Sequence, residues 1–293
     1  MQTRSPPSDN RSSLTTTDNG LTAFREFLRI DLTQATRTID TSQMLLRKFI
    51  RETGKPPSDI TEHDIRGYLS KLRGTRKPKT YNNMLGALKR FFWDFLKRPE
   101  VVESFKFVKV INGMVEVPTT EELRRFFAAL ETDCDRALFL FYATTGLRRS
   151  EALSLRKEDI DPVTRKVTAS QAHENYSTKN AGITFYNGEA ADYLNRYLAQ
   201  RADRDERLFP VNEDFLRKHF KKAGLRSGVR ITPQKLRDWF CQTMGELGVP
   251  DRFVDAFCGR VPASVLARRY TDYRPDRLKA IYDKAGLRVL DAA

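Results

Sequence analysis

The segment ATTGLRRSEALSL, residues 143–155, places two arginines and a glutamate inside an otherwise apolar stretch. Gly146 is expected to end the preceding helix. Arg148 and Glu151 lie three residues apart, so on a helix they share one face. The carboxylate can then brace the guanidinium, whose forked N–H donors match the oxygens of a phosphate. The segment is either a solvated surface charge pair or a site that holds an anion, and the rest of the chain has to separate the two.

The segment TPQKLRDWF, residues 232–240, starts another helix whose spacing predicts a buried face and a polar face side by side. The predicted buried face comprises Leu236, Phe240, Thr243 and Leu247. The predicted polar face comprises Gln234, Arg237 and Asp238. These three residues lie at neighbour spacings, 234 to 237 and 234 to 238, on the face next to the buried one.

The segment CGRVPASVLARRY, residues 258–270, combines helix boundaries with a hydroxyl group. Gly259 is predicted to end one helix and is followed directly by Arg260, and Tyr270 lies near the end of the next helix. Each of these three segments is a weak signal by itself. The order in which they follow one another along the chain is more specific.

That order resembles the tyrosine recombinase (phage integrase) family. It consists of a Thr-Gly-Leu-Arg-x-Ser-Glu segment, a lysine in the STKNAG turn, a Leu-Arg helix start, a Gly-basic pair and a downstream tyrosine. The most specific piece is TTGLRRSEALSLRKEDID, residues 144–161, which is similar to the family's first signature over its whole length. The resemblance covers roughly residues 115–285, and the helical segment before them is similar to the family's core-binding domain by pattern only.

The resemblance implies a reaction and a set of roles. A tyrosine hydroxyl attacks a DNA phosphodiester and forms a 3′-phosphotyrosine, arginines stabilise the charge of the transition state, and a lysine protonates the leaving 5′-oxygen. The bond energy is kept in the covalent link, so no cofactor and no metal are expected. The implied catalytic residues are Arg148, Lys179, Gln234, Arg237, Arg260 and Tyr270, with Glu151 and Lys235 in support.

The chain departs from the family's usual signatures at two places. The usual His-x-Leu-Arg-His is Gln-Lys-Leu-Arg-Asp at residues 234–238, and the usual Gly-His is Gly259-Arg260. Gln234 can hydrogen-bond a phosphate oxygen but cannot act as a base near neutral pH, and Arg260 keeps a donor without accepting a proton. These replacements resemble those of archaeal virus and plasmid integrases.

The identity of the nucleophile depends on helix geometry. Tyr270 follows Arg260 by ten residues, one more than the common family spacing, and Tyr273 is the alternative. If Pro262 occupies the first turn of a helix, Leu266 and Tyr270 lie on one face of it. With Leu266 packed into the domain, Tyr270 would be carried to the side of Arg260. We therefore predict Tyr270 as the nucleophile.

The elements that must position these residues are mainly helices, with one small β-sheet. A disordered polar arm is predicted over residues 1–20 and a core-binding domain of four helices over residues 21–98. A linker over residues 99–117 would lead to a catalytic domain over residues 118–293. In that domain KVTASQAHEN and ITFYN, within residues 166–187, predict a β-hairpin.

The predicted fourth helix, residues 79–98, has an apolar stripe flanked by basic side chains. The stripe is expected to face the core and comprises Leu85, Leu88, Phe91, Phe92 and Phe95. The basic residues that could meet DNA phosphates are Lys77, Lys79, Lys89, Arg90, Lys97 and Arg98. We expect the first four of these to contribute most to DNA binding.

The composition favours a polyanionic partner. The 293 residues include 52 basic and 38 acidic ones, a formal net charge of +14, and no apolar run approaches the length of a membrane span. Cys134, Cys241 and Cys258 are scattered without a C-x-x-C pair, which argues against a disulfide scaffold or a zinc site and favours a reducing, cytoplasmic setting.

The resemblance also implies partners. These are double-stranded DNA with inverted core sites and three further copies of the chain. The protein would be a monomer in solution and a tetramer on nucleoid DNA. The tetramer would exchange strands through a Holliday junction. Two alternatives stay open. One is a DNA-binding homologue without catalysis, suggested by the missing histidines. The other is a type IB topoisomerase-like enzyme that nicks and relaxes DNA without pairing two sites.

Overall fold

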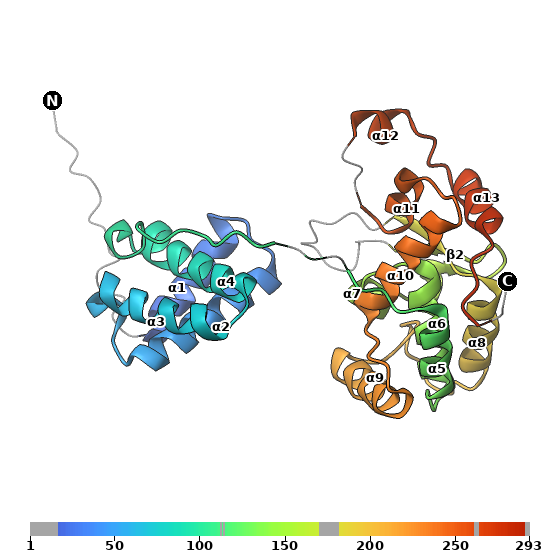
Figure 1. Ribbon diagram of the computed structural model, residues 1–293, viewed down its shortest axis with the longest axis horizontal. Helices are drawn as coiled ribbons and strands as arrows, with labels where there is room; N and C mark the ends of the chain where they lie inside the picture. The colour runs from blue at the N-terminus through green and yellow to red at the C-terminus, as the bar shows by residue number, and fades with distance from the viewer. Residues whose placement is uncertain (1–16, 112, 114, 170–181, 261–263, 291–293) are drawn as a thin grey trace. The chain divides into compact units, whose positions relative to one another are not determined.

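The structure is a computed structural model that describes residues 17–111, 113, 115–169, 182–260 and 264–290 (Figure 1). The chain divides into two units, Met1–Gly113 and Met114–Ala293, and each unit has a hydrophobic core of its own. The fold is mainly helical with one small antiparallel sheet, as the sequence predicts. In the described part of the chain, no helix is long and apolar enough to cross a membrane.

The first unit contains the four predicted helices. They are α1 (Thr17–Ile30), α2 (Thr36–Thr53), α3 (Glu62–Thr75) and α4 (Pro78–Lys89). The helix α1 begins at Thr17, inside residues 1–20, which were predicted to be a disordered polar arm. A capping box starts α3, where Thr61 and Asp64 exchange side-chain-to-backbone hydrogen bonds.

The predicted apolar stripe of the fourth helix lies in the core of the first unit. Leu85, Leu88, Phe91, Phe92 and Phe95 are all buried, and the second half of the stripe is a π-helical turn, Arg90–Phe95, that continues α4. The Phe91 ring packs edge-on against Phe24 at a centroid distance of 5.1 Å. Aromatic packing of this kind, more than helix propensity, holds the unit together.

The segment after the fourth helix is also part of the first unit's core. Val101, Val102 and Phe105 are buried there, although they fall within the stretch 99–117. The side chain of Asn82 fixes the next residues by donating to the carbonyl of Val108 at 2.8 Å and accepting from its N–H at 2.9 Å. The chain therefore stays packed well beyond the end of α4.

The second unit contains nine helices among the described residues. They are α5 (Thr120–Ala128), α6 (Asp133–Thr145), α7 (Arg149–Ser154), α8 (Gly188–Ala199), α9 (Glu213–Ser227), α10 (Pro233–Glu246), α11 (Asp251–Phe257), α12 (Val265–Tyr270) and α13 (Pro275–Ala285). Thr119 caps α5 by accepting from the N–H of Glu122 at 3.2 Å.

The sheet of the second unit has three short antiparallel strands. These are β1 (Ile160–Asp161), β2 (Lys166–Thr168) and β3 (Ile183–Phe185), and β2 lies between the other two. Val167 pairs with Thr184, which confirms the predicted hairpin, whereas β1 was not foreseen. Lys179 belongs to the connection between β2 and β3 and lies outside the described residues.

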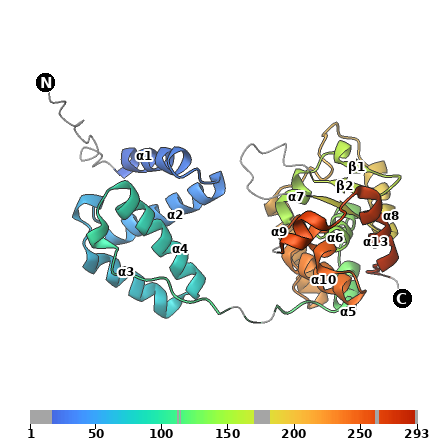
Figure 2. The same ribbon diagram turned by 90° about the horizontal axis from the view of Figure 1, so that it is seen from above.

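Helix α6 runs through the second unit against α8 and α10 (Figure 1, Figure 2). Every residue from Ala137 to Ala143 is fully buried, because neighbouring elements cover the helix all round. Its last carbonyls have side-chain donors: Thr184 Oγ1 donates to the Thr145 carbonyl and the Tyr282 hydroxyl to the Thr144 carbonyl, both at 2.7 Å. The end of α6 is thus held in place where the chain turns into the Arg148 segment.

Candidate active site

The turn between α6 and α7 requires glycine. Gly146 has φ +65°, a left-handed conformation that ends α6, as predicted. A Cβ at this position would lie 2.5 Å from a ring carbon of Phe240 and 3.1 Å from the sulfur of Cys258, so a side chain also has no room. The turn directs the next residues away from α6, and Arg148 becomes the N-cap residue of α7.

Glu151 links two arginines that are 89 residues apart in the sequence. Its carboxylate accepts from the backbone N–H of Arg148 at 2.7 Å and from the Arg148 guanidinium at 2.5 Å, so the predicted contact is present. The same carboxylate also forms an ion pair with Arg237, with 3.7 Å between Glu151 Oε2 and Arg237 Nη1. One carboxylate therefore orients both guanidiniums, while 26% of the Arg148 side chain stays exposed.

Arg237 is buried between the ends of two helices. Its side chain is 3% exposed, and its guanidinium donates to the Gly146 carbonyl at 2.6 Å and to the Cys258 carbonyl at 2.7 Å. These carbonyls lie at the C-terminal ends of α6 and α11, where the helix dipoles favour a cation. A guanidinium has five N–H donors, so two carbonyls do not exhaust it.

The predicted faces of α10 are wrong in part. Arg237 lies on the buried face and not beside it, because the carbonyls and Glu151 compensate for its charge there. Leu247, which was placed on the buried face, is 44% exposed, and Thr243 is only half-buried. Trp239 and Met244 complete the buried face in their place.

Arg260 lies close enough to act on the same cluster. The pKa of Arg237 is lowered from its ordinary value. Burial of the side chain is the largest cause, and the nearby charges of Arg148 and Arg260 lower the pKa further. Arg260 follows Gly259, whose φ is +60°, and its guanidinium lies 3.5 Å from the Asp255 carboxylate with 42% of the side chain exposed. Arg260 is thus a third guanidinium whose charge reaches Arg237, while Glu151 compensates the charges of the other two.

The first turn of α10 carries the polar residues that replace the usual histidines. Gln234 is exposed and donates through Nε2 to Asp238 Oδ1 at 2.8 Å, which sets the orientation of its amide. Lys235 is half-buried, and its backbone N–H is bound by the capping hydroxyl of Thr232 at 3.2 Å. No residue of this turn can take up a proton as a histidine would.

Tyr270 lies on α12, at an edge of the second unit (Figure 1). Tyr270 is 77% exposed and Leu266 is 70% exposed. The condition that Leu266 packs into the domain is therefore not met. The helix begins at Val265, and Pro262 lies outside the described residues. A helix of six residues buries too little apolar surface to hold itself against the core.

Tyr273, the alternative nucleophile, has a structural place. Its hydroxyl donates to the Ala267 carbonyl at 2.7 Å, and its ring packs edge-on against Phe253 of α11 at 6.1 Å. It anchors the end of α12 to the unit, so its oxygen already has a partner. The exposed Tyr270 has the more accessible hydroxyl of the two.

Comparison with known proteins decides the family. Residues 116–277 match the phage integrase family, and residues 21–100 match the N-terminal SAM-like domain of phage integrases. The chain belongs to the phage integrase (tyrosine recombinase) family. The resemblance drawn from the sequence is thereby confirmed, together with the recombinase activity that it implied.

Archaeal tyrosine recombinases are among the relatives. Tyrosine recombinase XerA of Thermococcus kodakarensis is 27% identical over 241 residues, which are 78% of this chain and 83% of that protein. XerA of Pyrococcus furiosus is 26% identical over 279 residues, 91% of this chain and 94% of its own. Among solved structures, a lambda integrase tetramer bound to a Holliday junction is similar in fold, with a TM-score of 0.65 at 15% identity over 87% of this chain and 77% of that one.

The basic residues predicted to bind DNA in the first unit have different surroundings. Lys77 and Lys79, at the start of α4, are exposed, whereas Lys89 and Arg90 are half-buried and Lys89 Nζ lies 5.2 Å from the centre of the Trp93 ring. Arg98 does not face outward as expected. It donates to the carbonyls of the turn before α3, including that of Ile60 at 2.9 Å, because those carbonyls need donors.

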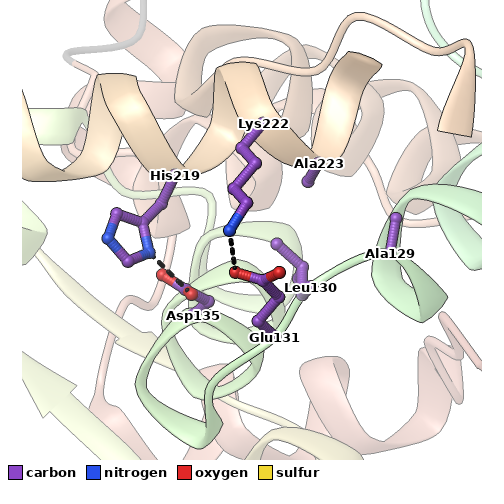
Figure 3. A pocket seen from close by; sticks show the side chains of 7 residues that line it. All are labelled: Ala129, Leu130, Glu131, Asp135, His219, Lys222 and Ala223. Carbon is purple, nitrogen blue, oxygen red and sulfur yellow. Dashed lines mark hydrogen bonds and ion pairs between the residues drawn. The ribbon is translucent and has the colours of Figure 1, made fainter. Parts of the chain in front are cut away.

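A second polar cluster of the second unit involves none of the predicted site residues. In Figure 3, His219 of α9 approaches Asp135 at 2.9 Å and Lys222 approaches Glu131 at 2.7 Å, around a small pocket. These pairs hold α9 against the first turn of α6 and the residues just before it. Among the described residues, no group of three or more His, Cys, Asp and Glu side chains is placed to hold a metal ion.

The sequence did not indicate two features next to the arginine cluster. One is the backbone carbonyl of Cys258, which binds Arg237, and the other is the proximity of the Cys241 and Cys258 thiols, whose sulfurs are 3.4 Å apart. The two cysteines are 17 residues apart in the sequence. No spacing rule brings them together, since their distance depends on how α10 packs against α11.

Proposed function

We propose that this recombinase cuts and rejoins DNA with Tyr270 as its nucleophile and a phosphate held by Arg148, Arg237 and Arg260. The observation that carries the proposal is the buried Arg237, fixed by two helix-end carbonyls and by the carboxylate that also braces Arg148. A cation held this firmly needs no reorganisation when negative charge develops on a phosphate beside it. Tyr270, on an exposed helix of the same unit, offers its hydroxyl to solvent and therefore to DNA.

The reaction is a transesterification with a covalent intermediate. The oxygen of Tyr270 forms a bond to phosphorus while the bond from phosphorus to the 5′-oxygen breaks. Lys179 gives a proton to the leaving 5′-oxygen, and Gln234 donates its amide to a phosphate oxygen as a replacement for the usual histidine. Lys235 and Glu151 support this arrangement. Attack by a 5′-hydroxyl on the phosphotyrosine reverses the steps and reseals the strand without nucleotide hydrolysis.

The partner that we propose is duplex DNA with inverted core sites, bound by a tetramer that forms from monomers. The net charge of +14 supports a polyanionic partner, and the likeness to an integrase tetramer on a Holliday junction supports strand exchange between two duplexes. Lys77, Lys79, Lys89 and Arg90 would contact the DNA backbone from the first unit. We place this activity on nucleoid DNA in the cytoplasm.

A covalent trapping experiment tests the proposal. Repeated binding from random-sequence duplexes first yields a duplex that the protein prefers, called the selected duplex below. A nick placed near the cleaved phosphate lets a short fragment diffuse away, so an active recombinase accumulates as a protein–DNA adduct. Binding of the selected duplex without any adduct would instead indicate a DNA-binding homologue.

A second measurement separates recombination from topoisomerase activity. Two labelled copies of the selected duplex are incubated with the protein, and four-way junctions are looked for on a native gel. Junctions that contain both labels support the recombinase. Adducts and plasmid relaxation without junctions would support the type IB topoisomerase-like alternative.

A further inference from the structure

Two thiols lie next to the arginine site without a role in the chemistry proposed above. Cys241 is a half-buried residue of α10, and Cys258 is the fully buried residue that ends α11. Their sulfurs are 3.4 Å apart. This contact links the helix that carries Arg237 to the residue that precedes Gly259-Arg260.

Cys258 is built into the surroundings of the arginine cluster. Its carbonyl accepts from Arg237 at 2.7 Å, and a Cβ at Gly146 would lie only 3.1 Å from its sulfur. Any displacement of Cys258 must therefore act on the Arg237 guanidinium, on the turn that presents Arg148, or on Arg260 two residues further along. The protein interior is close-packed, so such a displacement is not absorbed locally.

The chemistry of the pair assigns different parts to the two sulfurs. A hydrogen bond from the Cys258 thiol lowers the pKa of Cys241 against the effect of burial, and the charges of Arg260 and Arg237 act in the same direction. The same hydrogen bond, with burial, raises the pKa of Cys258. At Cys134, by contrast, burial raises the thiol pKa to about 11. Cys241 is therefore the thiol that reacts first with an oxidant, and Cys258 is the partner beside it.

We propose that Cys241 and Cys258 form a redox-modification site, at which hydrogen peroxide oxidises the two thiols to a disulfide that stops DNA cleavage. In the first step the Cys241 thiolate attacks a peroxide oxygen, an S–O bond forms, the O–O bond breaks, and the departing hydroxide takes up a proton as water. In the second step the sulfur of Cys258 attacks that of Cys241. The S–S bond forms, the S–O bond breaks, and the second hydroxide leaves as water with the Cys258 proton. In sum, two thiols and one hydrogen peroxide give one disulfide and two waters.

The effect on activity follows from the change in distance. Bond formation shortens the distance between the two sulfurs from 3.4 Å to about 2.05 Å. The movements of Cys241 and Cys258 together therefore have to exceed an ångström. The Cys258 carbonyl and Arg260 move with that change. A misplacement of this size in a catalytic site costs roughly 100-fold in rate. We expect a fall of about that size in the rate of adduct formation, with restoration by dithiothreitol.

The test measures the modification and its effect separately, because the activity half of the inference depends on the proposed function. The full-length protein is treated with hydrogen peroxide, alkylated and digested without reductant, and the peptides that contain Cys241 and Cys258 are identified by mass spectrometry. Adduct formation on the nicked selected duplex is measured before oxidation, after it, and after dithiothreitol. We expect one cross-linked peptide pair and a reversible loss of cleavage.

Matched variants identify the residues. Cys241→Ser keeps nearly the same side-chain shape. This variant should cleave at the same rate as the wild type with both thiols reduced, and it should lose no activity when treated with peroxide. Cys258→Ala removes the same bond from the other side and guards against a folding defect in the first variant. Cys134→Ser should stay as sensitive to peroxide as the wild type.

Three results bear on the outcome. Unpaired Cys241 and Cys258 peptides after oxidation would overturn the proposal, and so would a complete disulfide with an unchanged rate of adduct formation. If the reduced wild type forms no adduct at all, it is the proposed function that fails. The peptide map then still decides whether the two thiols are a modification site.

Discussion

The arginine cluster and the α12 segment belong to the same unit and are held in opposite ways. Arg237 is 3% exposed and is bound by two helix-end carbonyls, while Glu151 ties Arg148 to it. Tyr270 is 77% exposed on a helix of six residues whose anchoring contacts come from Tyr273. Arg148 and Arg237 are thus oriented without DNA, whereas the proposed nucleophile is exposed on a short helix.

This difference separates two requirements of the reaction. Charges that stabilise a transition state work best when they are oriented in advance, since reorganising them would cost part of the stabilisation. A nucleophile that cuts DNA, by contrast, is useful only after the duplex is correctly bound. A weakly held helix can make cleavage depend on DNA and on assembly, because ordering it requires a binding partner.

The largest effect is expected at the nucleophile. Tyr270→Phe removes one oxygen and no charge, so the adduct on the nicked selected duplex should disappear while binding of that duplex stays unchanged. Tyr273→Phe is the control, because it loses only the hydrogen bond to Ala267, worth about 1 kcal/mol, and should still form the adduct. Peptide mapping of the trapped adduct checks both. DNA attached to Tyr273 would show that the wrong tyrosine has been assigned.

The next effect concerns the arginine cluster. Arg148→Ala should slow cleavage by about 10³-fold without weakening duplex binding, since affinity is spread over many basic residues. Arg149→Ala is its matched control, because that neighbour pairs with Glu213 at 2.8 Å on the surface. Arg237→Ala should slow cleavage as much and also lower the free energy of unfolding by about 2 kcal/mol, because it leaves two carbonyls without their donor.

Cleavage rates, binding curves and thermal unfolding of these variants provide the measurements. A preorganised cluster would be disproved by an Arg148→Ala variant that cleaves within threefold of the wild type. Loss of binding in parallel with cleavage would assign Arg148 to DNA affinity and not to the transition state.

Lys179 should show an intermediate effect that depends on the leaving group. Lys179→Ala is expected to slow cleavage of ordinary DNA by about 10²-fold or more, since it removes the proposed general acid. A substrate with sulfur in place of the 5′-oxygen needs no proton on its leaving group and should be cut at nearly the wild-type rate. Cleavage rates of both substrates are compared for the two proteins. Equal slowing on both would remove Lys179 from this role.

The smallest effect is expected at Glu151. Glu151→Gln keeps the shape of the side chain and removes the charge that orients both arginines, which should cost about 1.4 kcal/mol in the transition state, a tenfold fall in cleavage. Glu213→Gln, which removes a surface partner of Arg149, is the control and should leave the rate unchanged. A Glu151→Gln variant with an unchanged rate would mean that the helix-end carbonyls orient Arg237 without help.

The residues that sequence reasoning placed correctly depend on local interactions. Gly146 ends α6, and Arg148 meets Glu151 three residues further along, so both features follow from spacing along the chain. The apolar stripe through Phe92 could be predicted in the same way, because helical periodicity alone decides which side chains share a face. The family's signature added the connection between distant segments.

Spacing could not predict the contacts made between elements. Leu266 has the pattern of a packed residue, yet it is exposed, because α12 has too few residues to dock by itself. Arg98 has the pattern of a DNA contact, yet it turns towards the carbonyls of another loop. In both residues the outcome depends on a partner far away in the sequence.

The sequence by itself determined the mainly helical fold, the turn at Gly146 and the types of residue in the site, since these follow from backbone sterics and helical period. The tertiary structure alone decided that Arg237 is buried between the ends of α6 and α11 and that the Cys241 and Cys258 sulfurs meet. The physical reason is that a buried charge is tolerated only where the fold gathers carbonyls and a carboxylate around it. That gathering depends on how the helices pack, which no single segment encodes.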